Sequence, residues 1–162
     1  MINELKTLML GDLIYNHRKW VCPVIGLDKD SITVVAQHYG DATYRREDNS
    51  AIPLTEDIIL ELGWEELKEG DEDFKRGIGR GKQYKHPWYT KTLMIVQNSL
   101  TDMYWCVDGE IVLRYVHDLQ HVLHHTVEDE IRYDWENKKF YLYCPEYHFS
   151  YDKKNGVKRD KR

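Results

Sequence analysis

The chain lacks the long apolar runs that mark membrane proteins. No apolar stretch in its 162 residues approaches the roughly 20 residues that span a bilayer. The opening MINELKTLMLGD mixes acidic and polar residues among its leucines, so it does not have the layout of a signal peptide. We therefore expect a cytoplasmic protein with no membrane partner.

Positive charge and cysteine are also in short supply. The net charge is −5, which argues against general nucleic-acid binding, because attraction to phosphates needs a cationic face. The exception is the basic tail KKNGVKRDKR at 153–162. The three cysteines are far apart and form no CxxC pair, which indicates reduced thiols in an intracellular protein.

Known catalytic motifs are missing. The chain has no G-x-S-x-G, no H-E-x-x-H and no H-x-E with P-C-x-x-C. GIGRGK at 77–82 lacks the glycine spacing and the following Ser or Thr of a phosphate-binding P-loop, so we interpret it as a surface loop. The sequence therefore predicts a protein that is not an enzyme and has no cofactor.

What the chain does contain is a succession of short β-type runs. GDLIYNH, KWVCPVIGL and SITVVAQ are rich in β-branched and aromatic residues and are separated by polar turns. Such strands within residues 8–54 predict a small SH3-like β-barrel. Residues 55–86 are predicted to form a short helix, capped by Thr55, and then a charged connection.

The second half predicts hairpins around one helix. MYWCV and EIVLR flank Asp108-Gly109, a strong hairpin signal, and we expect residues 87–149 to form hairpins with a helix at 114–126. Residues 150–162 are expected to be a basic, flexible tail. The predicted fold class is α+β and β-rich: an SH3-like barrel, then a second small antiparallel sheet with one packed helix.

The stretch YVHDLQHVLHH at 115–125 holds half of the eight histidines. Helical periodicity places Leu119, Val122 and Leu123 on one apolar face. The nearly opposite stripe holds four possible metal ligands, His117, His121, His124 and Glu128. H-x3-H spacing can chelate zinc, but a stripe in water fixes no fourth ligand. We therefore predict solvated histidines, with a metal site as the rival hypothesis.

Aromatic residues are plentiful, with twelve Tyr and five Trp. Where a cation stands beside an aromatic ring, the pair can stack a base and hold a phosphate. The candidate residues for binding a small anionic ligand are Tyr44, Arg45, Arg46, Arg80, Lys82, Trp88 and Tyr89. Because Tyr and Trp are also enriched in interfaces, we expect a homodimer or a higher homo-oligomer.

Two segments together resemble a protein family. IPLTEDIILELGW, preceded by a GD barrel start and followed by LRYVHDLQHVL, resembles small accessory proteins of phages and prophages of gut Bacteroidales. The matched region runs from residue 8 to about 127, and His121, His124 and His125 lie outside the pattern.

The resemblance implies a phage accessory gene but no activity. With the aromatic and cationic residues, it suggests a non-enzymatic protein that sequesters a small nucleotide-type signal of host defence. The alternative is a module that docks a host or phage protein.

Overall fold

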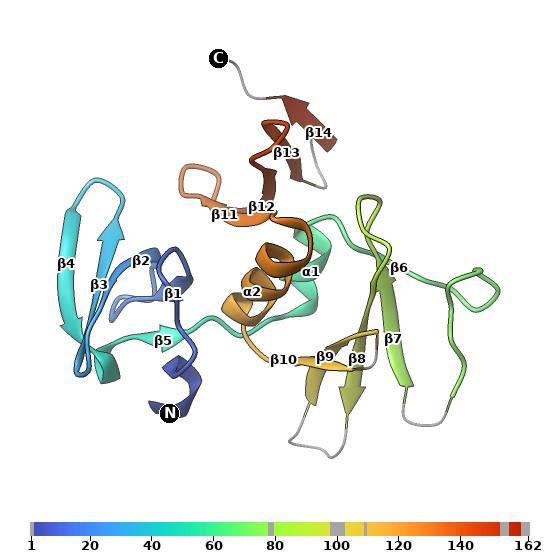
Figure 1. Cartoon of the computed structure of the whole chain (residues 1–162), viewed down its shortest axis with the longest axis horizontal. Coiled ribbons are helices and arrows are strands. Elements are labelled where there is room, and N and C mark those ends of the chain that lie inside the picture. The colour runs from blue at the N-terminus through green and yellow to red at the C-terminus, as the bar shows by residue number, and fades with distance from the viewer. Residues whose placement is uncertain (1, 78–79, 98–102, 109, 153–155, 160–162) are drawn as a thin grey trace.

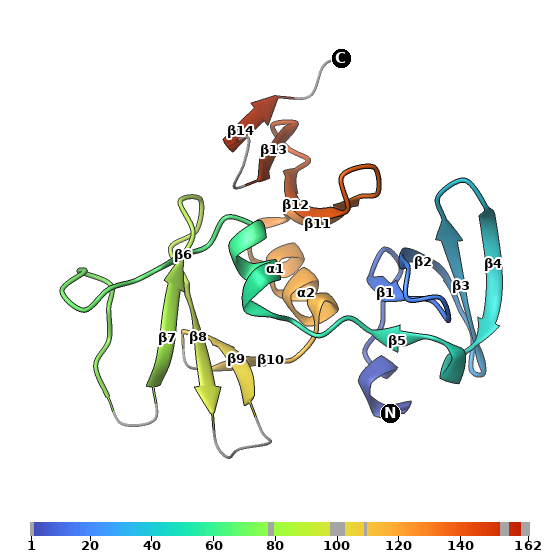
Figure 2. The ribbon, with the colours of Figure 1, turned by 180° about the vertical axis from the view of Figure 1, so that it is seen from behind.

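The computed structural model describes residues 2–77, 80–97, 103–108, 110–152 and 156–159. Within these residues the chain forms three antiparallel sheets and two α-helices. The helices lie in the middle, with the N-terminal sheet on one side, the second sheet on the other and the third sheet above them (Figures 1 and 2). The prediction of a β-rich α+β protein is therefore confirmed.

The first sheet has the strand order β4-β3-β2-β1-β5. Its elements, with the two short 3-10 turns beside them, are η1 Ile2–Leu5, β1 Leu13–Tyr15, β2 Val21–Leu27, β3 Ser31–Ala36, β4 Gly40–Arg45, η2 Arg46–Asp48 and β5 Ser50–Ala51. The SH3-like barrel is not confirmed, because β4 and β5 are the two edges and no pairing among the described residues closes the sheet. The edge β5 has only two residues and pairs with β1 alone, so it offers little backbone to meet β4.

The second sheet has the order β10-β9-β8-β7-β6. Its strands are β6 Glu65–Glu66, β7 Arg80–Lys85, β8 Thr92–Gln97, β9 Met103–Val107 and β10 Ile111–Leu113. The β9–β10 hairpin is confirmed, although Gly109 of its turn lies outside the described residues.

The loop that we predicted at 77–82 is in fact partly strand β7. Gly81 explains why this polar segment can pair with β8. A Cβ at this position would lie 2.5 Å from the backbone oxygen of Ile95, so only glycine lets the two strands approach so closely. The glycine therefore has a packing role. In sequence, the segment suggested only a phosphate-binding loop or a surface loop, and neither interpretation identifies that role.

The third sheet also differs from prediction. It has the order β11-β12-β13-β14, with strands β11 Glu130–Asp134, β12 Lys139–Cys144, β13 Phe149–Asp152 and β14 Gly156–Arg159. The second half thus holds two sheets rather than one. Residues 149–152 pair with 156–159, so much of the segment predicted as a flexible tail is a hairpin. Asn155-Gly156 is the hairpin signal in the sequence that the tail prediction overlooked.

The two α-helices are α1 Glu56–Glu61 and α2 Val116–Val127. Thr55 caps α1 as predicted, because its side chain accepts a hydrogen bond from the Ile58 amide at 3.3 Å. Tyr115 precedes α2, where Asp118 accepts the Tyr115 amide at 2.9 Å. Neither helix has the length and apolar character that a membrane-spanning helix requires.

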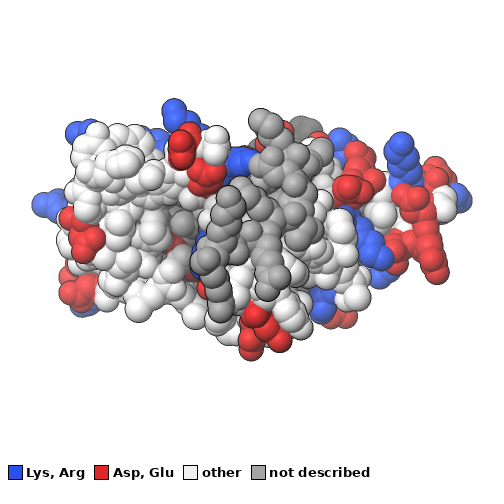
Figure 3. All heavy atoms as spheres, turned by 90° about the horizontal axis from the view of Figure 1, so that it is seen from above, with Lys and Arg blue, Asp and Glu red and all other residues white. Residues whose placement is uncertain are grey.

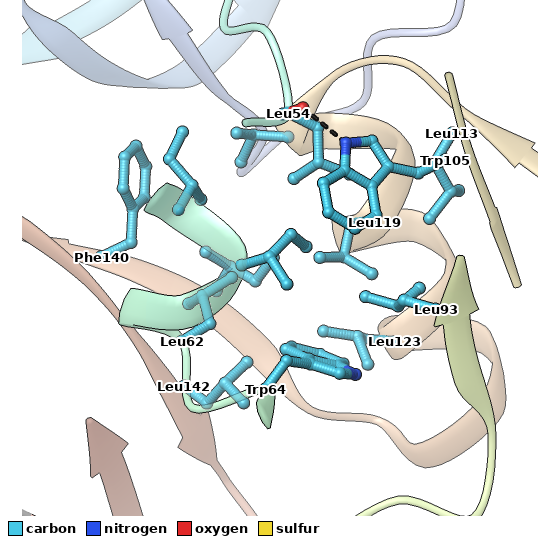
Figure 4. Close-up of a cluster of buried hydrophobic side chains, with 14 of the residues drawn as sticks. Leu54, Leu62, Trp64, Leu93, Trp105, Leu113, Leu119, Leu123, Phe140 and Leu142 are labelled. Carbon is cyan, nitrogen blue, oxygen red and sulfur yellow. Dashed lines mark hydrogen bonds between the residues drawn. The ribbon is translucent and has the colours of Figure 1, made fainter. Parts of the chain in front are cut away.

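The larger core lies between the helices, the second sheet and the third sheet (Figure 4). Leu119 and Leu123 of α2 are buried in it, as the apolar face predicts, and Val122 packs against it. The indole N–H of Trp105 donates to the backbone oxygen of Leu54 at 2.7 Å. This bond ties β9 to the segment that leads into α1.

The segments around Ile52–Leu54 and Arg114–Val116 meet in this structure. The Leu54 amide donates to the Arg114 oxygen at 3.0 Å, and the Val116 amide donates to the Ile52 oxygen at 2.9 Å. Pro53 and Tyr115 form the antiparallel bridge between these bonds. The IPL and RYV residues therefore join the first half of the chain to α2, which gives them an architectural role.

His86 is buried beside Trp64 and Tyr89, with 1% of its surface exposed. Its Nε2 lies 2.9 Å from the Leu62 oxygen, and its Nδ1 accepts the Trp88 amide at 3.0 Å. The ring therefore sits here in its neutral form. Burial lowers the pKa of His86 from 6.5 to about 4, although the bond to Leu62 opposes this shift.

We expect the fold to lose stability in mild acid because of His86. The unfolded chain binds a proton near pH 6.5 and the folded protein only near pH 4. This contribution is thus fully present above pH 6.5, and about 3 kcal/mol of it is lost as the pH falls toward 4. Urea unfolding between pH 7 and 4.5 measures the slope, which should flatten in His86→Gln. A slope unchanged in His86→Gln, yet flattened in the control His124→Gln at an exposed position, would contradict this assignment.

Candidate functional site

Three of the seven predicted ligand residues lie on or directly beside the first sheet. Arg45 is exposed at the end of β4, and the Tyr44 ring lies 4.7 Å from that of His17. The Arg46 guanidinium donates to the backbone oxygen of Asp28 at 2.7 and 2.9 Å, and to the backbone oxygen of Leu5 at 3.4 Å. Arg46 therefore connects the neighbouring turns. Its Nε, Nη1 and Nη2 all donate to backbone oxygens of the protein itself.

The other four lie on or beside the second sheet. The Lys82 amino group lies 3.4 Å from Glu56 Oε2, and the backbone of Arg80 pairs with that of Val96. Trp88 packs edge-on against Tyr151. Tyr89 is buried. Its hydroxyl donates at 2.6 Å to Oδ2 of Asp129, the residue directly before β11.

The seven residues therefore fall into two groups on different sheets, with the helices between those sheets (Figure 1). The structure does not bring them together into one site. Tyr89 in particular belongs to the larger core, where burial raises the pKa of its hydroxyl.

The histidine stripe of α2 is not solvated along its length, contrary to our prediction. His117 is fully buried and His121 is half-buried, whereas His124 and Glu128 are exposed. The prediction assumed that α2 has one covered face. In the structure, α2 is covered on one side by the larger core and on the other by residues around β1, so part of the stripe faces protein.

His121 forms a close pair with Asp12. Its Nε2 lies 2.8 Å from Asp12 Oδ2, which also accepts the Met9 amide at 2.7 Å. Next to this pair, Gln120 accepts the Leu13 amide at 2.8 Å and donates to the Gly11 oxygen at 3.3 Å. The GD segment and the YVHDLQH segment are thus direct partners, and together they attach α2 to the first sheet.

His117 lies deeper, stacked on Tyr115 at a centroid distance of 5.5 Å. Its Nε2 is 3.4 Å from the Thr7 hydroxyl, and burial lowers its pKa. Within the described residues, no group of three or more His, Cys, Asp or Glu side chains is placed to hold a metal ion. The rival zinc hypothesis therefore gains no support from the geometry of the stripe.

The outer end of this stripe opens into a cleft of about 1010 Å³. We call it the inter-sheet cleft. One wall is the segment Met9–Leu13 with neighbouring residues of the first sheet, and its floor carries His121 and His124 of α2. The opposite wall consists of residues 129–135 and the adjoining β12. Edge strand β11 therefore faces the cleft together with α2 and the first sheet.

The cleft combines aromatic rings with charges of both signs. The aromatic residues are Tyr133, Trp135 and Tyr141, and the cations are Arg132 and Lys139. Arg132 lies over the ring of Tyr143 at 3.6 Å and pairs with Glu130 at 2.9 Å. This arrangement fixes one guanidinium on the outer wall of the cleft.

All four acidic residues of the cleft already accept hydrogen bonds within the protein. Asp12 accepts from Met9, Asp129 from Tyr89, and Glu130 from Arg132. Asp134 accepts the side chain of Asn137 at 2.7 Å, which lowers the Asp134 pKa. Of these donors only Arg132 carries a positive charge, so Glu130 is the one carboxylate of the four whose charge these contacts offset.

Sequence reasoning missed this cleft, because its walls come from three separate stretches of chain. One signal was present: Tyr133, Trp135 and Tyr141 cluster in the β11–β12 hairpin. Comparisons with protein-family models, with curated proteins and with solved structures give no significant match, so the function must be inferred from the chain's own residues.

Proposed function

We propose that this protein is a non-enzymatic binding protein that holds a small ligand in the inter-sheet cleft. The observation that carries the proposal is a cleft of about 1010 Å³ with stacking rings and cations on one wall. Ligand sites are typically concave, with rings and a few polar groups that fix orientation. The volume exceeds what one aromatic ring needs, so the cleft has room for a ligand the size of a nucleotide.

The chemistry of the lining supports a ligand with a flat ring and an anionic group. Tyr141 lies directly across from Arg132 in the β11–β12 pair, so a ring and a guanidinium share one face of the hairpin. A base can stack on the ring, and a phosphate can bind the guanidinium through the N–H donors that Glu130 does not take. Taken with the phage resemblance, this favours a protein that sequesters a nucleotide-type signal of host defence.

A thermal-shift panel of linear and cyclic nucleotides tests the proposal. A ligand at 100 times its dissociation constant should add roughly 2.7 kcal/mol to the free energy of unfolding. Arg132→Ala should weaken the binding of the responding nucleotide about ten-fold, because a charge-assisted hydrogen bond is lost. Arg45→Ala is the matched control, since it removes the same charge from an exposed position outside the cleft.

Three outcomes contradict the cleft proposal. One is a panel with no response. Another is binding that Arg132→Ala leaves intact. The third is binding that Arg45→Ala weakens as much as Arg132→Ala does, because this would return the site to the first sheet.

Protein docking is the second candidate function, and a separate observation favours it. The Trp20 and Tyr39 rings lie 5.1 Å apart in the connections before β2 and β4 of the first sheet, and Tyr39 is 72% exposed. Arg18 lies over the Trp20 ring at 5.3 Å. Exposed aromatic rings beside an arginine are typical of interface centres. The partner would be a second copy of the chain, which light scattering detects, or a host or phage protein.

The charges on one face of the molecule give no support to a nucleic-acid partner. On the face drawn in Figure 3, Lys and Arg side chains are mixed with Asp and Glu side chains, and no broad area of positive charge appears. A phosphate backbone requires such an area.

A further inference from the structure

Trp64 carries a buried hydrogen-bond donor that has no partner among the described residues. The side chain is 2% exposed, and its Nε1 makes no hydrogen bond within the protein. Trp105, which is buried to a similar extent, donates its indole N–H to Leu54. A buried donor left unpaired costs about 1–3 kcal/mol, so the unpaired indole of Trp64 needs an explanation.

Trp64 borders a cavity of about 180 Å³ between the second sheet and the C-terminal half of α2. We call it the indole pocket. Its other walls are mainly apolar and include Leu93, Val107, Leu119 and Leu123. In Figure 4 the indole nitrogen is at the end of the Trp64 ring that lies toward Leu93 and Leu123. The donor therefore faces the side on which the pocket lies.

The size and lining of the indole pocket restrict what it can hold. An apolar cavity of roughly 150 Å³ binds benzene, so this pocket has room for one substituted aromatic ring. At its outer end lie Lys91 and Val127, both of which are partly exposed, so a small molecule can enter there. A purely apolar occupant would leave the indole N–H unpaired, whereas an oxygen acceptor would pair it.

We propose that the indole pocket is a second binding site, for a mainly apolar molecule of about one ring that carries a hydrogen-bond-accepting oxygen. The carbonyl oxygen of such a molecule accepts from Trp64 Nε1, and its ring packs against the leucines. The indole pocket shares no lining residue with the inter-sheet cleft, so this site is independent of the proposed nucleotide site.

Acetophenone and ethylbenzene form a matched pair of probes, because they differ in the carbonyl group. In a ¹H–¹⁵N spectrum of the indole groups, acetophenone should shift the Trp64 N–H signal downfield, as a new hydrogen bond does. Acetophenone should also bind about five-fold more tightly than ethylbenzene, which corresponds to one net hydrogen bond. Trp64→Phe assigns the signal and should abolish the preference, whereas Trp20→Phe, at an exposed ring, should preserve it.

A second variant keeps the test valid if Trp64→Phe fails to fold. Val127→Phe enlarges a partly exposed residue at the outer end of the pocket and leaves the indole in place. It should weaken acetophenone binding. Equal binding of the two probes, an unmoved Trp64 signal at saturating acetophenone, or unchanged binding in Val127→Phe would overturn the proposal. None of these outcomes bears on the cleft, which the Arg132→Ala comparison tests separately.

Discussion

Replacing Gly63 with alanine is expected to lower the free energy of unfolding by about 4 kcal/mol. Gly63 follows α1 and has a φ of +103°, a backbone conformation that residues with a Cβ rarely adopt. It also lies under a packed ring. An added Cβ would be 1.9 Å from Tyr151 Cε1 and 2.8 Å from His86 Nε2, both far inside van der Waals contact.

Gly70 offers a matched control for the Gly63 substitution. Its φ is +109°, close to that of Gly63, but a Cβ there would meet nothing within 4 Å. Gly70→Ala therefore reports the backbone strain alone, about 1–2 kcal/mol, and the excess in Gly63→Ala reports the clash. Urea unfolding of the two variants and the natural protein measures both. If the two substitutions lower stability equally, Tyr151 does not pack on Gly63 as the structure places it.

The Gly63 contact also shows why the tail was mispredicted. Tyr151 of β13 packs edge-on against His86 and Trp88, so the third sheet is anchored to the far side of the core. In the sequence, Tyr151 stands among lysines and an aspartate, and that composition is typical of a mobile segment. The partners that order it are about 65 and 90 residues away, and a local pattern carries no information on them.

The sequence predicted correctly those features that are formed by residues close together in the chain. The cap at Thr55 and the β9–β10 and β11–β12 hairpins depend on contacts within a few residues, and all three are found. Closure of the first sheet depends instead on whether its two edge strands meet. Short strands at regular spacing are compatible with either an open or a closed sheet, so the barrel was an over-interpretation.

The candidate site shows the same limit. Asp12 and His121 are separated by 109 residues and become partners because α2 lies across the first sheet. The periodicity of α2 correctly identifies Leu119 and Leu123 as buried. It cannot show that a second part of the protein covers the opposite face, which buries His117. Helical periodicity identifies one covered face but gives no evidence that the other is exposed.

Leu119→Ala is expected to lower the free energy of unfolding by about 3 to 4 kcal/mol. Leu119 is 1% exposed, lies in the larger core, and faces α1 and the second sheet near the middle of α2. Truncation removes buried methyl groups and leaves a cavity that the surrounding sheets are too constrained to fill. The loss should appear as a lower denaturation midpoint with an unchanged slope against urea, because the surface exposed on unfolding hardly changes.

Val122→Ala is the control on the same helix, because Val122 is only partly buried at the edge of the core and loses fewer buried atoms. It should lower stability by about 1 kcal/mol. Leu119 also lines the indole pocket, so Leu119→Ala enlarges that pocket as it destabilises the fold. A ring-sized ligand should therefore restore part of the lost stability in Leu119→Ala, as an occupant of an engineered cavity does. An unchanged midpoint in Leu119→Ala would mean that α2 presents a different face to the core. The placements of His121 and of Trp64 relative to α2 would then both be wrong.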